Sequence, residues 1–236
     1  MERIDKILSN MGFGSRKEIK QFIKDDLVYV NEKLVKKPNE KYDPYKDEII
    51  INGEKVYYRK YIYLMMNKPQ NTVSATFDNL HETVIDLLPF DYKAFEPFPV
   101  GRLDKDTVGL LLITNDGELN HKLLSPKSEI SKVYYAYLEK EVDEKAIKKF
   151  EKGIVLDDGY KCLPGKLEIV SEDKKEARVT IMEGKFHQVK RMFHAVDNEV
   201  TFLEREKFGP LPLDPNLEEG EFRELTEKEV NLLKDA

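Results

Sequence analysis

The stretch Val108–Ile113 (VGLLLI) restricts the fold of this chain more than any other feature. It is apolar on both faces of an extended strand, so we expect the strand to be covered on both sides inside a sheet. The run is far too short to span a bilayer. Carboxylates flank it, because Asp104 and Asp106 precede it and Asp116 follows it. A carboxylate beside buried surface costs free energy unless something holds it there.

The three aspartates suit different roles. Gly101 permits a turn just before Asp104, so this loop can present a rigid carboxylate at the mouth of the strand, as a catalytic group requires. Asp106 would share the face of Asp104, and two carboxylates suggest a glycosidase pair, but residues at this spacing are poorly placed to flank a sugar from two sides. Asp116, in an Asn-Asp-Gly turn, is best explained as a helix cap.

The composition indicates a globular protein, since 40% of the 236 residues are hydrophobic and 36% are charged. The single cysteine, Cys162, excludes an internal disulfide, and no signal-peptide core follows Met1, so we expect a soluble cytoplasmic protein. The net charge of −6 is unevenly distributed: residues 1–60 hold 14 Lys and Arg against 11 Asp and Glu. A basic front end on an acidic body indicates a local nucleic-acid site.

Residues 1–55 have the pattern of a compact unit of helices and hairpins. Apolar residues at helical spacing predict a helix in residues 2–11, and Ser15 with Glu18 forms a capping box that begins a second, basic helix. Two short hairpins follow. This order resembles the S4 RNA-binding domain, which implies that basic residues contact RNA phosphates; the candidates are Arg3, Arg16, Lys17 and Lys20. Residues 56–60 are expected to be a linker.

Residues 61–236 predict a larger catalytic domain. Strand patterns outnumber helical ones and the connections are short, so we expect an α+β fold with a mixed, mainly antiparallel sheet and flanking helices. The expected helices include residues 116–125, 143–154 and 185–197, and a loop with a short helix occupies 81–99.

The predicted helix at 185–197 carries an apolar face and an opposite face with His187, Lys190, Arg191 and His194. The two histidines are too far apart to share a metal ion comfortably, and no carboxylate or cysteine shares their spacing, so we expect no metal site. A cationic face beside Gly184 suits an anion, either a phosphate or a carboxylate that must stay ionised. A merely solvated face remains the alternative for some of the four.

Three tyrosines lie in KVYYAYL, residues 132–138. Strand packing explains Tyr135 and Tyr137. Tyr134 shares a sheet face with Lys132, and an aromatic ring in that position can stack on a nucleic-acid base.

Four motifs occur in the order GRLDKDTVGLLLITNDGEL, KVYYAYL, EGKFHQVKRMF and GEFRELTEKE. Together they resemble the pseudouridine synthases of the RsuA group, which carry an N-terminal S4 domain, over essentially the whole chain. The resemblance implies that Asp104 is the catalytic residue, that Tyr134 stacks on the target uracil and that Lys190 pairs with the carboxylate. Ile181 corresponds to an apolar residue that packs the pocket. The remaining substrate-binding candidates are Arg102, His187 and Gln188.

One position departs from the family pattern. After Lys68-Pro69-Gln70 the family usually has glycine, whereas this chain has Asn71. Because asparagine tolerates left-handed backbone, we expect the turn to survive.

The implied reaction is the isomerisation of uridine in ribosomal RNA, without any cofactor, by a monomeric cytoplasmic enzyme. EGKFHQVKRMF resembles the small-subunit (16S) members, with His187, Gln188 and Lys190 as the discriminating residues. Two alternatives stay open: a large-subunit (23S) synthase of the same group, and a non-catalytic RNA-binding factor of ribosome assembly. An intact set of Asp104, Tyr134 and Lys190 argues against the second.

Overall fold

The computed structural model describes residues 1–236 and divides into two compact units. The first contains residues 1–62 and 88–97, and the second contains residues 63–87 and 98–236. The sequence did not indicate that residues 88–97, which hold the short helix α3 (Phe90–Lys93), belong to the first unit. The division into residues 1–55, 56–60 and 61–236 stays a prediction.

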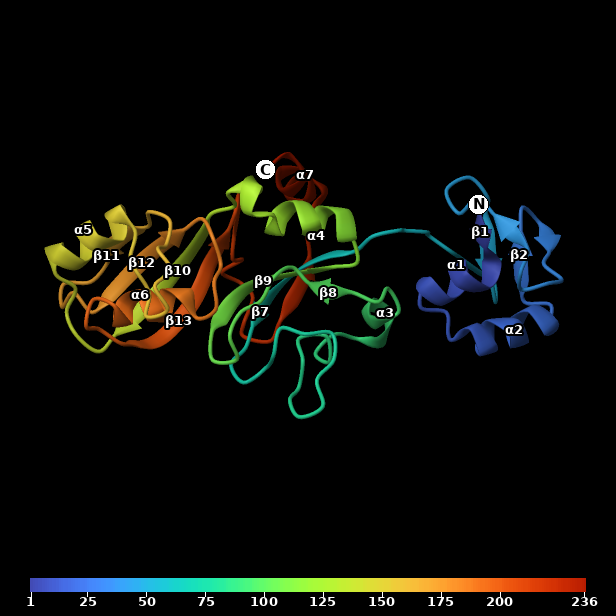
Figure 1. The fold of residues 1–236 in the computed structure, drawn as a ribbon. Coiled ribbons are helices and arrows are strands. Elements are labelled where there is room, and N and C mark those ends of the chain that lie inside the picture. Colours follow the sequence, from blue (N-terminus) through green and yellow to red (C-terminus); the bar gives the residue numbers. More distant parts are fainter. The chain divides into compact units, whose positions relative to one another are not determined.

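The first unit has the predicted order of helix, basic helix and hairpin (Figure 1). Its sheet runs in the order β3-β2-β5-β6 and is antiparallel throughout, while β1 pairs with β4. Besides α3, the elements are β1 (Glu2–Arg3), α1 (Ile4–Asn10), α2 (Arg16–Lys24), β2 (Val28–Val30), β3 (Lys33–Leu34), β4 (Lys41–Tyr42), β5 (Ile49–Ile51) and β6 (Glu54–Lys55).

Helix α2 begins where the capping box predicted. The Ser15 hydroxyl accepts a hydrogen bond from the Glu18 backbone N–H (3.3 Å), and the Ser15 N–H donates to the Glu18 carboxylate (2.7 Å). Ile19 and Ile23 of α2 are buried in one core with Ile4, Ile7 and Leu8 of α1. The apolar faces of both helices thus build the core, and the basic side chains of α2 face outward.

The second unit is built on a nine-stranded sheet in the order β11-β12-β10-β13-β9-β7-β15, with β14 on β13 and β8 on β9. Only the β13–β9 pair is parallel, so the predicted mixed, mainly antiparallel sheet of an α+β fold is confirmed. The strands are β7 (Tyr63–Lys68), β8 (Phe98–Pro99), β9 (Val108–Thr114), β10 (Lys132–Leu138), β11 (Lys166–Ile169), β12 (Glu176–Ile181), β13 (Val200–Phe208), β14 (Leu211–Pro212) and β15 (Phe222–Glu224).

Strand β9 is the buried run from which the fold was inferred, and every one of its residues is buried. Its parallel contact with β13 requires glycine at one position. Gly109 has φ +99°, and a Cβ there would lie 2.6 Å from the carbonyl oxygen of Arg205. The backbones of β9 and β13 therefore approach so closely that no larger residue fits without displacement.

The helices flank this sheet, and α4 and α7 lie on the same side of β7 and β9 (Figure 1). The helices are α4 (Gly117–Leu124), α5 (Glu144–Lys152), α6 (Gln188–His194) and α7 (Glu227–Asp235), with a 3-10 turn at Pro126–Ser128. Asp116 is the N-cap of α4, because its carboxylate accepts from the Leu119 N–H (3.1 Å), and this confirms its structural role. No helix has the combined length and apolar character needed to cross a membrane.

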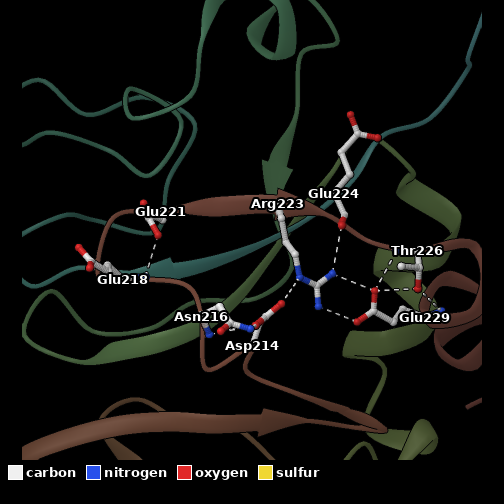
Figure 2. A network of polar contacts seen from close by, with 8 residues as sticks. All are labelled: Asp214, Asn216, Glu218, Glu221, Arg223, Glu224, Thr226 and Glu229. Atoms are coloured by element: carbon white, nitrogen blue, oxygen red, sulfur yellow. Dashed lines mark hydrogen bonds and ion pairs between the residues drawn. The ribbon is translucent and has the colours of Figure 1, made fainter.

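The acidic C-terminal segment is organised by one arginine (Figure 2). Arg223 of β15 donates to Asp214 (2.6 Å) and holds both carboxylate oxygens of Glu229 (2.8 and 2.9 Å). Glu229 also completes a capping box with Thr226 at the start of α7. The hydrogen bonds from Arg223 lower the pKa of Glu229 to about 2. The guanidinium therefore joins the loop before β15 to the final helix.

Candidate active site

The loop between Gly101 and β9 carries Asp104 at the mouth of the buried strand, as the sequence predicted. Gly101 has φ +75°, and the Asp104 carbonyl accepts a hydrogen bond from the Thr107 N–H (3.1 Å), which closes a turn. The Asp104 side chain is 27% exposed, so its carboxylate is partly accessible to solvent.

A buried lysine holds this loop from below. Lys68 of β7 has no exposed surface, and its ammonium donates to the carbonyl oxygens of Pro69 (2.9 Å), Thr107 (2.9 Å) and Lys105 (3.4 Å). Burial lowers the pKa of Lys68 to about 8, although the nearby carboxylates of Asp106 and Asp104 act against this shift. The reactive loop is therefore tied to the centre of the sheet.

Two further residues fix the loop backbone. The Ser74 hydroxyl accepts from the Leu103 N–H (3.1 Å) and donates to the Leu103 carbonyl (3.0 Å). Asn71 has φ +66°, and its N–H donates to the Lys105 carbonyl (2.9 Å), so the left-handed turn expected at this position is present. The sequence reasoning missed Lys68 and Ser74 as supports of the loop. For Lys68, the signal in the sequence was its position directly after the strand-like run YLMMN, where a charged side chain becomes buried.

Helix α6 brings two basic residues to Asp104. His187 Nε2 lies 3.6 Å from Asp104 Oδ1, and Lys190 Nζ lies 3.4 Å from Asp104 Oδ2. Lys190 Nζ lies still nearer to Asp106 Oδ1, at 2.5 Å. Burial is the largest single influence on Asp106 and would raise its pKa, but the hydrogen bond and the charge of Lys190, with smaller contributions, together leave this pKa lowered. Asp106 thus shares the Lys190 ammonium with Asp104.

The predicted helix at 185–197 begins only at Gln188, and its cationic face is divided. Arg191 forms ion pairs with Asp157 and Asp158, and His194 pairs with Glu199 (2.7 Å), so neither side chain points to Asp104. The division arises because consecutive residues on a helix lie about 100° apart. Two of the four cations, His187 and Lys190, therefore lie at the Asp104 carboxylate, and the other two pair with carboxylates elsewhere.

A cleft with a volume of about 70 Å³ opens beside Asp104. Six of the seven predicted catalytic and substrate-binding residues line it, and the seventh, Lys190, contacts the lining carboxylate Asp104. The six are Arg102, Asp104, Tyr134, Ile181, His187 and Gln188. The fold brings them together from the loop before β9, from β10, from the end of β12 and from the start of α6.

Tyr134 and Ile181 form an aromatic and apolar part of the cleft wall. Tyr134 is 7% exposed and Ile181 is 2% exposed. A charged carboxylate at one side of an aromatic surface can act as a nucleophile or base on a planar ring that stacks there. The ammonium of Lys190 places a positive charge 3.4 Å from this carboxylate.

Gln188 is buried and its amide is engaged within the protein. Its Oε1 accepts from the Lys185 N–H (2.8 Å), and its Nε2 donates to Glu183 (2.9 Å). These bonds fix the turn that presents His187. The prediction that Gln188 binds substrate stays a prediction.

The basic residues of the first unit fall into two groups. Arg16, Lys17 and Lys20 are exposed on α2, as contact with a phosphate backbone requires. Arg3 instead directs its guanidinium to the buried carboxylate of Asp5 through two hydrogen bonds (2.7 and 3.0 Å). Arg3 is therefore partly committed to neutralising Asp5.

Comparison with known families gives two matches. The family described as RNA pseudouridylate synthase matches residues 62–195, and the S4 domain matches residues 2–49. A crystal structure of a pseudouridylate synthase superposes with a TM-score of 0.69 at 34% identity, covering 99% of this chain and 100% of that chain.

Three relatives align over nearly their whole length. An uncharacterized RNA pseudouridine synthase of Bacillus subtilis is 49% identical, covering 99% of this chain and 98% of the relative. The ribosomal large subunit pseudouridine synthase B of the same species is 39% identical (99% and 96% covered). The ribosomal small subunit pseudouridine synthase A of Vibrio vulnificus is 37% identical (97% and 98% covered).

Proposed function

The chain belongs to the RNA pseudouridine synthase family, in its RsuA-type branch with an N-terminal S4 domain, and we propose that its substrate is a uridine of small-subunit (16S) ribosomal RNA. The observation that carries the assignment of the active site is the position of Asp104 in the cleft, with Lys190 and His187 within 3.6 Å and Tyr134 in the same wall.

In this proposal Asp104 is the catalytic carboxylate and Tyr134 stacks on the target uracil. The N1–C1′ bond breaks, the uracil turns, a C5–C1′ bond forms, and the proton lost from C5 is balanced by one gained at N1. Product and substrate are isomers, so the reaction needs no oxidant, reductant or cofactor. The uridine must leave its stack to reach the cleft, because its C1′ is inaccessible within a helix.

Lys190 pairs with the Asp104 carboxylate, and Ile181 packs against the inserted base. Arg102 and His187 stand at the cleft where the ribose and phosphate of a flipped nucleotide would lie. Gln188 supports these contacts by fixing the turn at Lys185.

The choice of 16S RNA rests on the residues 186–190 (FHQVK), which resemble the small-subunit members of the group. The rival target is 23S RNA, and a large-subunit synthase of Bacillus subtilis is as similar to this chain as the small-subunit relative of Vibrio vulnificus. A non-catalytic role is less favoured, because Asp104, Tyr134 and Lys190 are all present and gathered at one cleft.

The S4 domain would hold ribosomal RNA through phosphates, mainly by Arg16, Lys17 and Lys20, with a smaller part for Arg3. A ribosomal RNA substrate implies that the enzyme works in the cytoplasm. We expect it to act as a monomer.

The test uses the purified chain with separate 16S and 23S transcripts, and pseudouridines are mapped by carbodiimide modification and primer extension. One new site in 16S RNA is expected, and the same site should be missing from rRNA of a strain that lacks the protein. Modification of 23S RNA alone would reject the small-subunit target. Absence of pseudouridine formation from both transcripts and from the comparison of strains would reject the enzymatic proposal.

The pairing of Lys190 has its own test. Lys190→Met should reduce kcat severely, and Lys190→Arg should reduce it less, because arginine keeps the charge but not the geometry. Equal kcat values for Lys190→Met and the wild type would show that the ammonium does not serve Asp104.

A further inference from the structure

An exposed aromatic ring stands at the rim of the cleft. Phe186 is 74% exposed, although burial of a phenylalanine side chain is normally favourable. Its ring lies flat on the imidazole of His187, with centroids 3.8 Å apart and planes inclined by 17°. His187 in turn lies 3.6 Å from Asp104. A two-ring stack therefore begins beside the catalytic carboxylate and ends in solvent.

The backbone that presents this stack is unusual. His187 has φ +47°, in the left-handed region that costs free energy for a residue with a Cβ. The conformation turns the chain immediately before α6 and directs residues 186 and 187 to the rim. Strain of this kind persists only where the surrounding structure determines it.

The surroundings do hold this turn firmly. Besides accepting from Gln188, the Glu183 carboxylate accepts hydrogen bonds from the Leu163 N–H (2.9 Å) and the Tyr160 hydroxyl (2.6 Å). The Lys185 ammonium lies 4.6 Å from the centroid of the Tyr160 ring. The segment from Glu183 to His187 is thus fixed at both ends, and its outer ring surface is preorganised.

The rim around the stack carries positive charge. Lys185 is its neighbour in the chain, and Arg102 is exposed at the same cleft. A flat apolar face beside cations is the combination that binds unpaired nucleotides, because the bases stack and the cations follow the phosphates.

We propose that the Phe186–His187 stack is a platform for the base next to the target uridine, so that Phe186 positions the substrate and contributes to its selection. This inference rests on the proposed function. When the uridine leaves its stack for the Tyr134 wall, the neighbouring base loses its partner. The outer face of Phe186 replaces that partner, and so stabilises the RNA conformation in which the uridine is extruded.

Two variants separate stacking from simple apolar packing. Phe186→Leu keeps apolar volume but loses the ring, and Phe186→Tyr keeps the ring. With rRNA as substrate, kcat/KM should fall about 5- to 100-fold in Phe186→Leu and stay within about threefold of wild type in Phe186→Tyr. Circular dichroism of both variants checks that the fold is kept. Equal kcat/KM for Phe186→Leu and wild type would overturn the platform.

A crosslinking experiment locates the RNA base that stacks on Phe186. p-Azidophenylalanine replaces Phe186, or Tyr137 as the control, since Tyr137 is 40% exposed and points to the opposite sheet face from Tyr134. After irradiation with rRNA, position 186 should crosslink within about two nucleotides of the uridine that wild type modifies. A crosslink at a distant site, or the same pattern from both positions, overturns the platform while the enzyme stays active. A wild-type chain that forms no pseudouridine refutes the proposed function, and the platform with it.

Discussion

Replacing Lys68 with methionine tests whether a buried ammonium supports the reactive loop. The pKa of Lys68 lies at about 8 in the folded protein against an ordinary 10.5, with burial as the main cause. Below pH 8 the lysine is charged in both the folded and the unfolded chain. Between pH 8 and 10.5 the unfolded chain binds more protons than the folded one, so the free energy of unfolding rises with pH in this window.

The size of the effect follows from the shift. The shift in the pKa of Lys68 corresponds to a total change of about 3 kcal/mol in the free energy of unfolding, and about 2.5 kcal/mol of this change falls between pH 7 and pH 10. These are upper values, because local water screens the buried charge. Wild type should therefore gain this much free energy of unfolding over Lys68→Met across that range. Lys132, whose pKa burial also lowers to about 8, contributes equally to both proteins and cancels in the difference.

The assay is urea unfolding followed by circular dichroism at pH 7, 8, 9 and 10. The difference between the two urea midpoints should change by about 1 M over the series, given an m value of about 2–3 kcal/mol/M. The control is Lys105→Met, an exposed lysine of the same loop, which should follow wild type. If wild type and Lys68→Met show parallel pH dependence, the ammonium of Lys68 is not buried as the structure has it, and the anchoring argument is refuted.

Three further predictions concern other parts of the molecule. Asp104→Asn should abolish pseudouridine formation in a single-turnover assay while RNA affinity in a filter-binding assay stays unchanged, and turnover at the wild-type rate would reject Asp104 as the catalytic group. As the pH falls from about 5 towards 2, the free energy of unfolding of wild type should fall by up to about 3 kcal/mol relative to that of Glu229→Gln, because the pKa of Glu229 is about 2 in the folded chain and 4.5 without its partners. Parallel acid unfolding curves for the two proteins would contradict this stabilisation. Simultaneous Ala substitution of Arg16, Lys17 and Lys20 should raise KM for rRNA, and should reduce the slope of log affinity against log salt by up to about one per lost phosphate contact. An unchanged slope and affinity would mean that this face of α2 is only solvated.

Local patterns in the sequence were sufficient where the interacting groups are close along the chain. Ser15 and Glu18 are three residues apart, and the capping box they predicted begins α2. Asp116 caps α4 through an N–H three residues on. The unbroken apolar run of β9 predicted a strand covered on both faces, and the order of the motifs indicated the family. Each of these inferences depends on propensity and periodicity over about ten residues or fewer.

Other features depended on groups that meet only after the chain has packed. Lys68 reaches the carbonyl of Thr107, 39 residues away, and Lys190 reaches Asp106, 84 residues away. No periodicity links residues at such separations, so the sharing of Lys190 between two aspartates could not be predicted from spacing alone. Likewise, the diversion of Arg191 to Asp157 depends on where the chain places a distant loop.

The residue types at the mouth of the buried strand, and the approximate positions of most helices and strands, could be predicted from the sequence. The start of α6 after a left-handed His187, and the exposed position of Phe186 beside it, could be seen only in the folded chain. The physical reason is that a positive φ at a non-glycine residue opposes local preference. It is maintained by ring packing and by the Gln188 side chain, which accepts a hydrogen bond from Lys185 and donates one to Glu183. These contacts exist only once β12 and α6 are in place.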